Sequence, residues 1–259
     1  MPAPIVMVHG AFCGGWVFDR FREPFEAAGH LCLTPDLRGH AATDHRSAAA
    51  GVSMSDYAAD VATLVESCDE PPILLGHSMG GLVAQLAAAR LSDPKALKGL
   101  ILLAPSPPWG VAGASMEEAI SAVSLYALGP FWVQAIDPDY ALAKLYSLDR
   151  MDRADRKAVF ARMVAESGRA LWETLNWWLD PFMTTSVAAH RIKAPALAVV
   201  GGRDLIHPAA TVKQTAARLG AELTVMREMS HWLPAEPGWD EVAAACLTWM
   251  ARDAALSAA

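Results

Sequence analysis

Short apolar runs alternate with helical segments along most of the chain. The apolar runs are rich in Ile, Leu and Val and have the length of buried strands: residues 4–8, 31–35, 72–76, 99–104, 195–201 and 222–227. Helical segments lie between several of them: residues 16–28, 55–68, 79–91, 208–219 and 239–252. Strands that are apolar throughout and separated by helices predict a parallel sheet with helices on both faces.

The segment 106–192 interrupts this alternation, because it contains no strand-like run. It holds five of the nine tryptophans: Trp109, Trp132, Trp172, Trp177 and Trp178. We interpret it as a mostly helical cap inserted after the fourth strand. The core then consists of two parts, residues 1–105 and 193–259.

Composition and charge restrict the partners and the compartment. The chain has 259 residues, 53% of them apolar, with a net charge of −7, which argues against nucleic acid as a partner. No apolar run reaches the ~18 residues of a membrane span, and residues 1–4 do not resemble a secretory signal, so we expect a cytoplasmic protein without membrane contact. Four cysteines show no metal-site spacing: Cys13, Cys32, Cys68 and Cys246.

The sequence Gly76-His77-Ser78-Met79-Gly80 lies where the third strand meets the following helix. Serine in a turn usually only caps a helix, but glycines on both sides of Ser78 allow a sharp, strained turn. Such a turn projects the serine hydroxyl above the sheet and directs the Met79 N–H toward the same space. The context therefore favours a nucleophile elbow over a cap.

A serine nucleophile needs a base and a third group that orients the base. Asp204 follows the fifth strand and His231 follows the sixth, so the chain order is Ser, Asp, His. His207 is the rival base. Because it precedes Pro208 at the start of a helix, we expect it to stay beside Asp204, whereas the loop of His231 can reach Ser78.

Five stretches together resemble the α/β-hydrolase family over the full length of the chain: VHGAFCGGW, PDLRGH, GHSMGG, GGRDLIHP and SHWLPAEP. The resemblance implies Ser78 as nucleophile, His231 as base and Asp204 as orienting acid. It also implies an oxyanion hole formed by the N–H groups of Ala11 and Met79, and no cofactor or metal. Since the first strand begins near residue 4, we expect six strands in the order 2-1-3-4-5-6 rather than the usual eight.

The loop HGAFCGGW is most similar to the branch of plant methyl-ester esterases and hydroxynitrile lyases. The lyases carry Thr where Gly10 stands and Lys where Trp232 stands, so the esterase side is favoured. Cys13 replaces a histidine common in the methyl esterases, which leaves the substrate within the branch open. No sequence feature pairs Cys13 with a base, so we interpret it as a pocket-lining residue.

These observations predict a serine hydrolase that cleaves a small carboxylic ester or lactone, and a homodimer is possible. C–C bond hydrolysis and cofactor-free perhydrolysis on the same fold stay open, and so does a ligand-binding receptor with slow hydrolysis. A structural protein with a fossil site is disfavoured by the complete triad. A substrate screen would separate the first two from an esterase, and large ligand-induced destabilisation with slow turnover would indicate a receptor.

We predict that Phe12, Trp109, Trp132 and Trp177 bind the substrate. We place Trp177 by treating residues 171–180 as one helix, in which each residue is rotated by about 100° from the one before. Leu171, Leu175 and Trp178 then share an apolar stripe with Trp172 and Leu179, and we expect this stripe to be buried. Trp177 falls on the other face with Glu173 and Asp180, where it would line the underside of the cap.

Overall fold

The central sheet has six parallel strands. The computed structural model describes residues 2–113 and 115–252. The strands are β1 (Ile5–Val8), β2 (Cys32–Leu33), β3 (Ile73–His77), β4 (Gly99–Leu103), β7 (Ala196–Gly201) and β8 (Glu222–Met226). Their order in the sheet is β2-β1-β3-β4-β7-β8, and every pairing is parallel. Both the six-stranded parallel sheet and its predicted order are confirmed.

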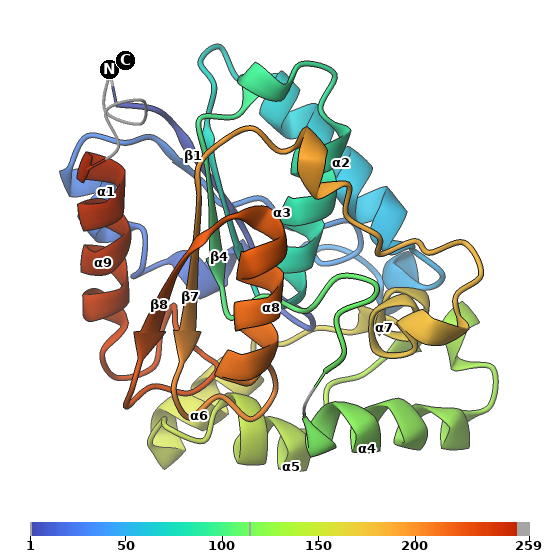
Figure 1. The fold of residues 1–259 in the computed structure, drawn as a ribbon. Coiled ribbons are helices and arrows are strands. Elements are labelled where there is room, and N and C mark those ends of the chain that lie inside the picture. Colours follow the sequence, from blue (N-terminus) through green and yellow to red (C-terminus); the bar gives the residue numbers. More distant parts are fainter. Residues whose placement is uncertain (1, 114, 253–259) are drawn as a thin grey trace.

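Helices cover both faces of this sheet (Figure 1). They are α1 (Glu23–Ala27) and α9 (Trp239–Arg252) on one face, and α2 (Met54–Glu66), α3 (Met79–Arg90) and α8 (Ala209–Leu219) on the other. Along β1, Ile5 and Met7 pack on the first face, whereas Val6 and Val8 pack on the second. Successive residues of a strand point to opposite faces, so strands apolar throughout are buried on both sides.

Local signals explain where two of the helices begin. Ser53 and Asp56 form the predicted capping box at the start of α2, with the Ser53 N–H donating to the Asp56 carboxylate at 2.9 Å. The single helix predicted over residues 16–28 is wrong, because the chain forms a 3-10 turn at Gly15–Phe18 and only then α1. Pro24 in the first turn of α1 favours a new helix start, since its missing N–H is not needed there.

The cap lies between β4 and β7, over the carboxyl ends of the strands (Figure 1). Its longer elements are α4 (Met116–Leu125), α6 (Arg153–Phe160) and α7 (Gly168–Leu175). Shorter ones are two 3-10 turns (Tyr126–Leu128, Phe131–Val133), α5 (Tyr140–Leu142), a π-turn (Ala143–Ser147) and a 3-10 turn (Trp177–Leu179). It also contains an antiparallel pair, β5 (Ala135–Ile136) and β6 (Glu166–Ser167). The expectation of no strand here is wrong, because two-residue strands leave no periodic pattern.

Two other 3-10 turns of the described residues join core elements, Arg46–Ala49 and Pro94–Ala96, and one at Ala189–Arg191 lies just before β7. Within residues 2–113 and 115–252, no helix combines the length and apolar character that crossing a membrane requires.

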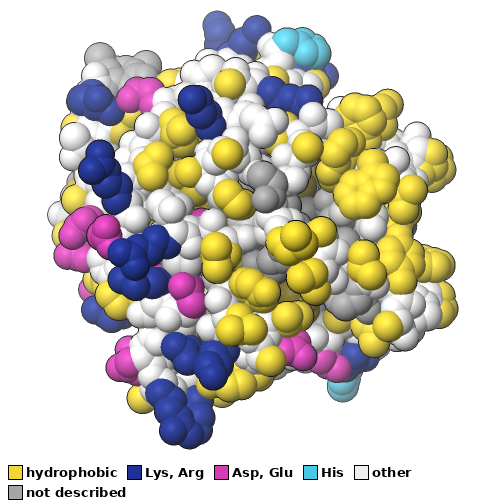
Figure 2. All heavy atoms as spheres, turned by 60° about the horizontal axis from the view of Figure 1, so that its bottom comes forward, with side chains coloured by type: hydrophobic (Ala, Val, Ile, Leu, Met, Phe, Trp, Pro, Cys, Tyr) yellow, Lys and Arg dark blue, Asp and Glu magenta, His cyan; other side chains and the backbone are white. Residues whose placement is uncertain are grey.

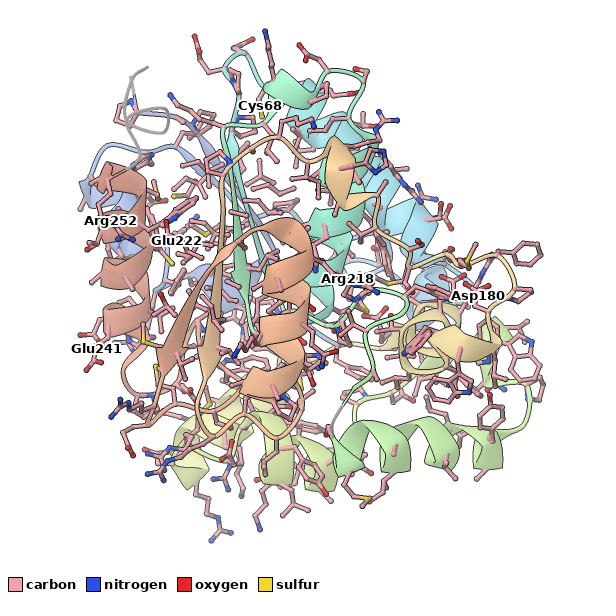
Figure 3. All side chains as sticks on the ribbon, in the orientation of Figure 1. Cys68, Asp180, Arg218, Glu222, Glu241 and Arg252 are labelled. Atoms are coloured by element: carbon pink, nitrogen blue, oxygen red, sulfur yellow. The ribbon has the colours of Figure 1, made fainter. Side chains whose placement is uncertain are left out.

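Hydrogen bonds anchor the cap to the core at both of its sides. At its start, the Arg218 guanidinium of α8 donates to the carbonyls of Trp109 and Gly110 at 2.7 and 2.9 Å (Figure 3). On α7, the Glu173 carboxylate accepts from the Ser53 hydroxyl and the Met54 N–H at the start of α2. These anchors fix the cap above the carboxyl edge of the sheet, where open parallel sheets bind ligands.

The outer surface of the cap carries many exposed apolar side chains. Figure 2 shows hydrophobic side chains gathered on the face that carries the cap. The most exposed of them include Phe182 at 84%, Met116 at 77% and Val123 at 72%. Because fewer apolar side chains of the cap are buried, we expect the cap to open at a lower free-energy cost than the core.

Candidate active site

Ser78 occupies a strained turn between β3 and α3. Its φ of 55° and ψ of −125° lie outside the regions that most residues adopt. A Cβ on Gly76 would collide with the carbonyl of Gly80, and a Cβ on Gly80 would collide with the carbonyl of His9. Both glycines are therefore required for the backbone to pass this closely. The turn is fixed by the Ser78 N–H, which donates to the Leu103 carbonyl at 2.9 Å.

Ser78, His231 and Asp204 form a continuous hydrogen-bonded chain. The Ser78 hydroxyl lies 2.9 Å from His231 Nε2, and His231 Nδ1 lies 2.9 Å from Asp204 Oδ2. A carboxylate only accepts, so Nδ1 carries the proton and Nε2 accepts from the serine hydroxyl. The fold thus brings together the three residues predicted as a triad, from the turn after β3 and the loops after β7 and β8.

The Asp204 carboxylate is held in its charged form. It is 4% exposed, and its Oδ1 accepts the N–H groups of Ile206 and His207, each at 2.9 Å. Burial opposes the charge, but the electrostatic interaction and the hydrogen bond with His231 outweigh it, and the pKa of Asp204 lies below its ordinary value. A charged Asp204 fixes the His231 tautomer and stabilises the imidazolium formed when His231 takes a proton.

Two residues that sequence reasoning did not assign to the site support the His231 loop. The His77 ring, buried with its pKa lowered to about 3 by desolvation, donates from Nε2 to the His231 carbonyl at 2.9 Å. The Glu236 carboxyl accepts the Ser230 N–H at 2.7 Å. Burial raises the pKa of Glu236 to about 7 against the opposing hydrogen bond from Ser230. The His77 contact joins residues 154 positions apart, so it has no sequence signal, whereas the Glu236 contact lies within one loop and was not predicted.

His207 lies beside the triad without joining it. Its Nε2 is 2.9 Å from the Ser106 hydroxyl, and its ring packs edge-on against the His231 ring with centroids 5.2 Å apart. The cavity therefore contains two serine–histidine pairs. In the Ser78–His231 pair, the histidine ring also bonds to a carboxylate.

Cys13 is poorly suited to act as a nucleophile. Its thiol is 1% exposed and donates to the Ala11 carbonyl at 3.2 Å. Burial, and then the nearby Glu166 charge, raise the pKa of the thiol well above its ordinary range. Because the thiolate is the reactive form, Cys13 serves as a wall of the cavity.

Ala11 and Met79, whose N–H groups form the predicted oxyanion hole, lie just beyond the ends of the neighbouring strands β1 and β3. Met79 is the first residue of α3, whose initial N–H groups have no partner within the helix. Ala11 is in the turn that follows β1, the strand paired with β3. Both residues line the same cavity as Ser78.

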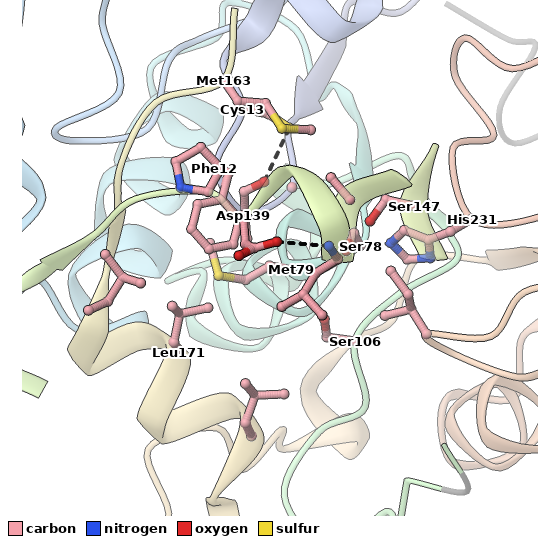
Figure 4. Close-up of a pocket in the computed structure, with 18 of the residues that line it drawn as sticks. Phe12, Cys13, Ser78, Met79, Ser106, Asp139, Ser147, Met163, Leu171 and His231 are labelled. Carbon is pink, nitrogen blue, oxygen red and sulfur yellow. Dashed lines mark hydrogen bonds between the residues drawn. The ribbon is translucent and has the colours of Figure 1, made fainter. Parts of the chain in front are cut away.

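The cavity encloses about 670 Å³ between the core and the cap. Figure 4 shows Ser78, Met79 and Ser106 close together and Leu171 on the neighbouring helix α7. The wall of the cavity is formed mainly by apolar side chains, among them Phe12, Leu125, Leu128, Ile136, Leu142, Met163, Leu171 and Leu175. Asp137 and Asp139 lie at the cap side, and no lysine or arginine of the described residues lines the cavity. Such a site accommodates a neutral, apolar group next to Ser78.

Of the four residues predicted to bind substrate, Phe12 lines the cavity, but Trp109, Trp132 and Trp177 are not among its described lining residues. Trp177 instead packs edge-on against Trp109, with ring centroids 5.5 Å apart. Trp132 is 42% exposed on the cap surface. On the cap side of the cavity, leucines line the wall where we had predicted tryptophans.

The single helix predicted over residues 171–180 is wrong. Helix α7 ends at Leu175, and the 3-10 turn at Trp177–Leu179 changes the direction of the following side chains. Glu173 and Asp180, expected in solvent, are 2% and 4% exposed. Both carboxylates accept backbone N–H groups, from Met54 for Glu173 and from Phe182 and Thr184 for Asp180. A helical wheel does not show that backbone N–H groups of distant residues can bind a carboxylate and so allow it to be buried.

Trp178, expected in the core of the cap, is 57% exposed. Replacing it with alanine should therefore change the free energy of unfolding by only about 0.5 kcal/mol, the range of surface substitutions. Leu171→Ala, at a residue 8% exposed, should cost about 2–5 kcal/mol. Urea unfolding monitored by circular dichroism measures both. Equal losses for the two variants would contradict the placement of Trp178.

The chain is similar to known α/β hydrolases in sequence and in fold. A model described as "Alpha/beta hydrolase family" matches residues 5–245. Salicylic acid-binding protein 2 of Nicotiana tabacum is 36% identical over 112 residues, which cover 42% of each chain. A carbendazim hydrolyzing esterase of a Nocardioides species is 32% identical over 167 residues, covering 61% of this chain and 68% of the relative. A crystal structure of a methylesterase from Arabidopsis matches with a TM-score of 0.72 and 16% identity, covering 96% of this chain and 99% of that one.

The match to the tobacco protein spans less than half of that protein's length, and the likeness to the Arabidopsis structure, at its low identity, concerns the fold.

Proposed function

Because the chain belongs to the alpha/beta hydrolase family, we propose that it hydrolyses a small, neutral carboxylic ester or lactone by way of an acyl-enzyme. The observation that carries this proposal is the chain of two 2.9 Å hydrogen bonds from Ser78 through His231 to Asp204, which opens into an apolar cavity. The similarity to a relative described as an esterase supports the same reaction class.

In the first half of the reaction, the Ser78 hydroxyl oxygen attacks the ester carbonyl carbon. His231 Nε2 takes the hydroxyl proton as the new C–O bond forms, and Asp204 stabilises the resulting imidazolium. The former carbonyl oxygen becomes an oxyanion that accepts from the N–H groups of Ala11 and Met79. A preorganised donor of this kind contributes about 3–4 kcal/mol where it has been measured in other enzymes.

The tetrahedral intermediate then collapses to the acyl-enzyme. The bond to the leaving oxygen breaks, and His231 returns its proton to that oxygen, so an alcohol departs. In the second half, a water molecule gives a proton to His231 and attacks the acyl carbon. Collapse of this second intermediate releases the carboxylic acid and returns the proton to Ser78. With a lactone, the alcohol and the acid are two ends of one product.

The charge of the cavity selects for neutral substrates. A substrate carboxylate would lose its water against apolar side chains, with no lysine or arginine of the described lining residues to replace it. Asp139 adds a negative charge at the cap side, while the Asp137 carboxylate is already paired with Arg46 at 2.8 Å. We therefore expect the enzyme to prefer acyl groups that carry no charge.

A pair of esters that differ in one charge tests this proposal. We expect kcat/KM for p-nitrophenyl butyrate to exceed that for mono-p-nitrophenyl succinate by at least about tenfold, or about 1.4 kcal/mol of differential transition-state binding. The two acyl chains have equal length, so the ratio reports the charge. Methyl esters and lactones belong in the same assay, to assign the leaving group. Equal rates for both p-nitrophenyl esters, or faster cleavage of the succinate, would contradict the assignment of substrate charge.

A further inference from the structure

A second buried carboxylate, Glu166, lies outside the triad. It belongs to β6 of the cap and is 0% exposed. Its Oε1 accepts from the Tyr57 hydroxyl and from the Ser167 N–H, each at 2.7 Å. Its Oε2 accepts from His40 Nε2 at 3.0 Å and from the Phe12 N–H at 3.3 Å. Four donors thus surround one carboxylate, and three of them come from the core.

These donors keep the buried Glu166 charged. Burial disfavours the carboxylate, but the charge and hydrogen bond of His40 outweigh burial and lower the pKa of Glu166. Burial likewise opposes the charged His40 ring, and the Glu166 charge outweighs it and raises the pKa of His40. His40 ends the PDLRGH stretch, which has no part in the proposed reaction. A charge buried this completely keeps a fixed geometry, since any unpaired donor or acceptor would be costly.

The contact with Phe12 joins the cap to the loop after β1. Phe12 has a φ of 63°, in the left-handed region that a bulky residue rarely adopts. Its N–H donates to Glu166, and its carbonyl accepts the Val164 N–H at 2.9 Å. The cap therefore holds both backbone polar groups of this residue. Strained backbone of this kind persists where surrounding contacts over-determine it.

We propose that Glu166 is a positioning residue for the oxyanion hole, acting through the Phe12 peptide group. The proposal rests on the proposed function, in which the Ala11 N–H stabilises the oxyanion. The peptide that Glu166 holds, between Ala11 and Phe12, directly follows the peptide that carries the Ala11 N–H. Fixing the second peptide restricts the orientation of the first. Oxyanion stabilisation depends on donors held at the position of the developing charge, so a freed loop lowers the rate.

Through these contacts with Phe12, the geometry of the oxyanion hole depends on the position of the cap. Glu166 and Val164 lie in the cap, whereas Ala11 and Phe12 lie in the core. A cap that moves away withdraws both contacts from Phe12. We therefore expect the oxyanion hole to be fully ordered only while β6 is seated on the core.

The chain offers a matched control for testing this role. Glu173 is also a cap carboxylate, 2% exposed, which accepts from the core at Ser53 and Met54. It makes no hydrogen bond to residues 9–14 within the described chain. Loss of either carboxylate weakens the attachment of the cap. Only loss of Glu166 releases the Phe12 N–H.

The experiment compares Glu166→Ala with Glu173→Ala. For Glu166→Ala we expect kcat on p-nitrophenyl butyrate to fall about 10- to 100-fold, while KM stays within about threefold of wild type. This loss is smaller than the loss expected when an oxyanion-hole donor is removed altogether, because the Ala11 N–H is still present. The Kd of phenylboronic acid, which forms a tetrahedral adduct with the serine, should rise by a similar factor. Amide exchange of a peptic peptide spanning residues 9–14 should become faster. Glu173→Ala should lower the melting temperature while leaving kcat and this Kd within about threefold of wild type.

Glu166→Gln keeps the test valid if Glu166→Ala does not fold. Its single amide oxygen serves either the Phe12 or the Ser167 N–H, so the rise in the boronate Kd should be at least about threefold and smaller than for alanine. Equal kcat, boronate Kd and exchange rates in the Glu166 and Glu173 variants would overturn the positioning role. If the wild type cleaved no ester, the proposed function would fail, and the exchange rate of residues 9–14 would still decide whether Glu166 holds the loop.

Discussion

Replacing Ser78 with alanine should lower kcat for p-nitrophenyl butyrate by about a millionfold, the loss seen when a triad serine is removed from another hydrolase. The hydroxyl oxygen is the atom that attacks, and its hydrogen bond to His231, which in turn contacts Asp204, supplies the base and the orienting carboxylate. The melting temperature should stay within about 2 °C, because alanine is nearly isosteric and the strained turn is fixed by backbone contacts.

Ser106→Ala is the control for this prediction. Its hydroxyl also lines the cavity and also contacts a histidine, His207, at 2.9 Å. Its loss should cost less than about tenfold in kcat, since its hydroxyl bonds to His207 and the hydrogen bonds from Ser78 through His231 to Asp204 stay in place. A Ser78→Ala variant that retained a tenth of the wild-type activity, or a Ser106→Ala variant that lost all of it, would show that the wrong serine has been assigned.

Replacing His231 with alanine should have a comparable effect, about a millionfold in kcat, because the serine then has no base and its hydroxyl stays protonated. The ring joins Ser78 and Asp204 through two 2.9 Å hydrogen bonds. In rapid-mixing experiments, any initial burst of p-nitrophenol from formation of the acyl-enzyme should be lost together with steady-state turnover, because acylation itself requires the base.

His207→Ala distinguishes the two histidines of the cavity. Its ring is 3% exposed, so its removal should lower the melting temperature. The triad hydrogen bonds do not pass through it, and we expect kcat to fall less than about tenfold. Full activity in His231→Ala together with an inactive His207→Ala would transfer the role of base to His207.

Several features of the site could be predicted because short-range chemistry determines them. Gly76 and Gly80 are needed wherever a strand turns sharply into a helix, and both close approaches occur. Asp204 and His231 follow neighbouring parallel strands, whose carboxyl ends meet at one edge of the sheet. Continuous apolar strands predicted a parallel sheet buried on both faces, whereas the order of its strands followed from the resemblance to the α/β-hydrolase family.

Apart from the single helix predicted over residues 16–28, the errors lie in the cap, where long-range contacts outweigh local patterns. The helical wheel for residues 171–180 assumed that charged side chains point to solvent, but Glu173 and Asp180 are buried by backbone N–H donors. Trp177, which the wheel placed on the same face as these two carboxylates, packs against Trp109. Glu166 gave no sequence signal, because its partners His40 and Tyr57 are more than a hundred residues away along the chain.

The central claim is that Ser78 is the nucleophile of an ester hydrolase, and covalent labelling tests it most directly. After incubation with a fluorophosphonate, intact-mass spectrometry should show a single adduct on the wild-type protein and none on Ser78→Ala. Peptide mapping should place that adduct on Ser78, and prior incubation with p-nitrophenyl butyrate should slow its formation. An adduct on Ser106, Ser147 or Cys13, or an unlabelled wild-type protein, would contradict the account.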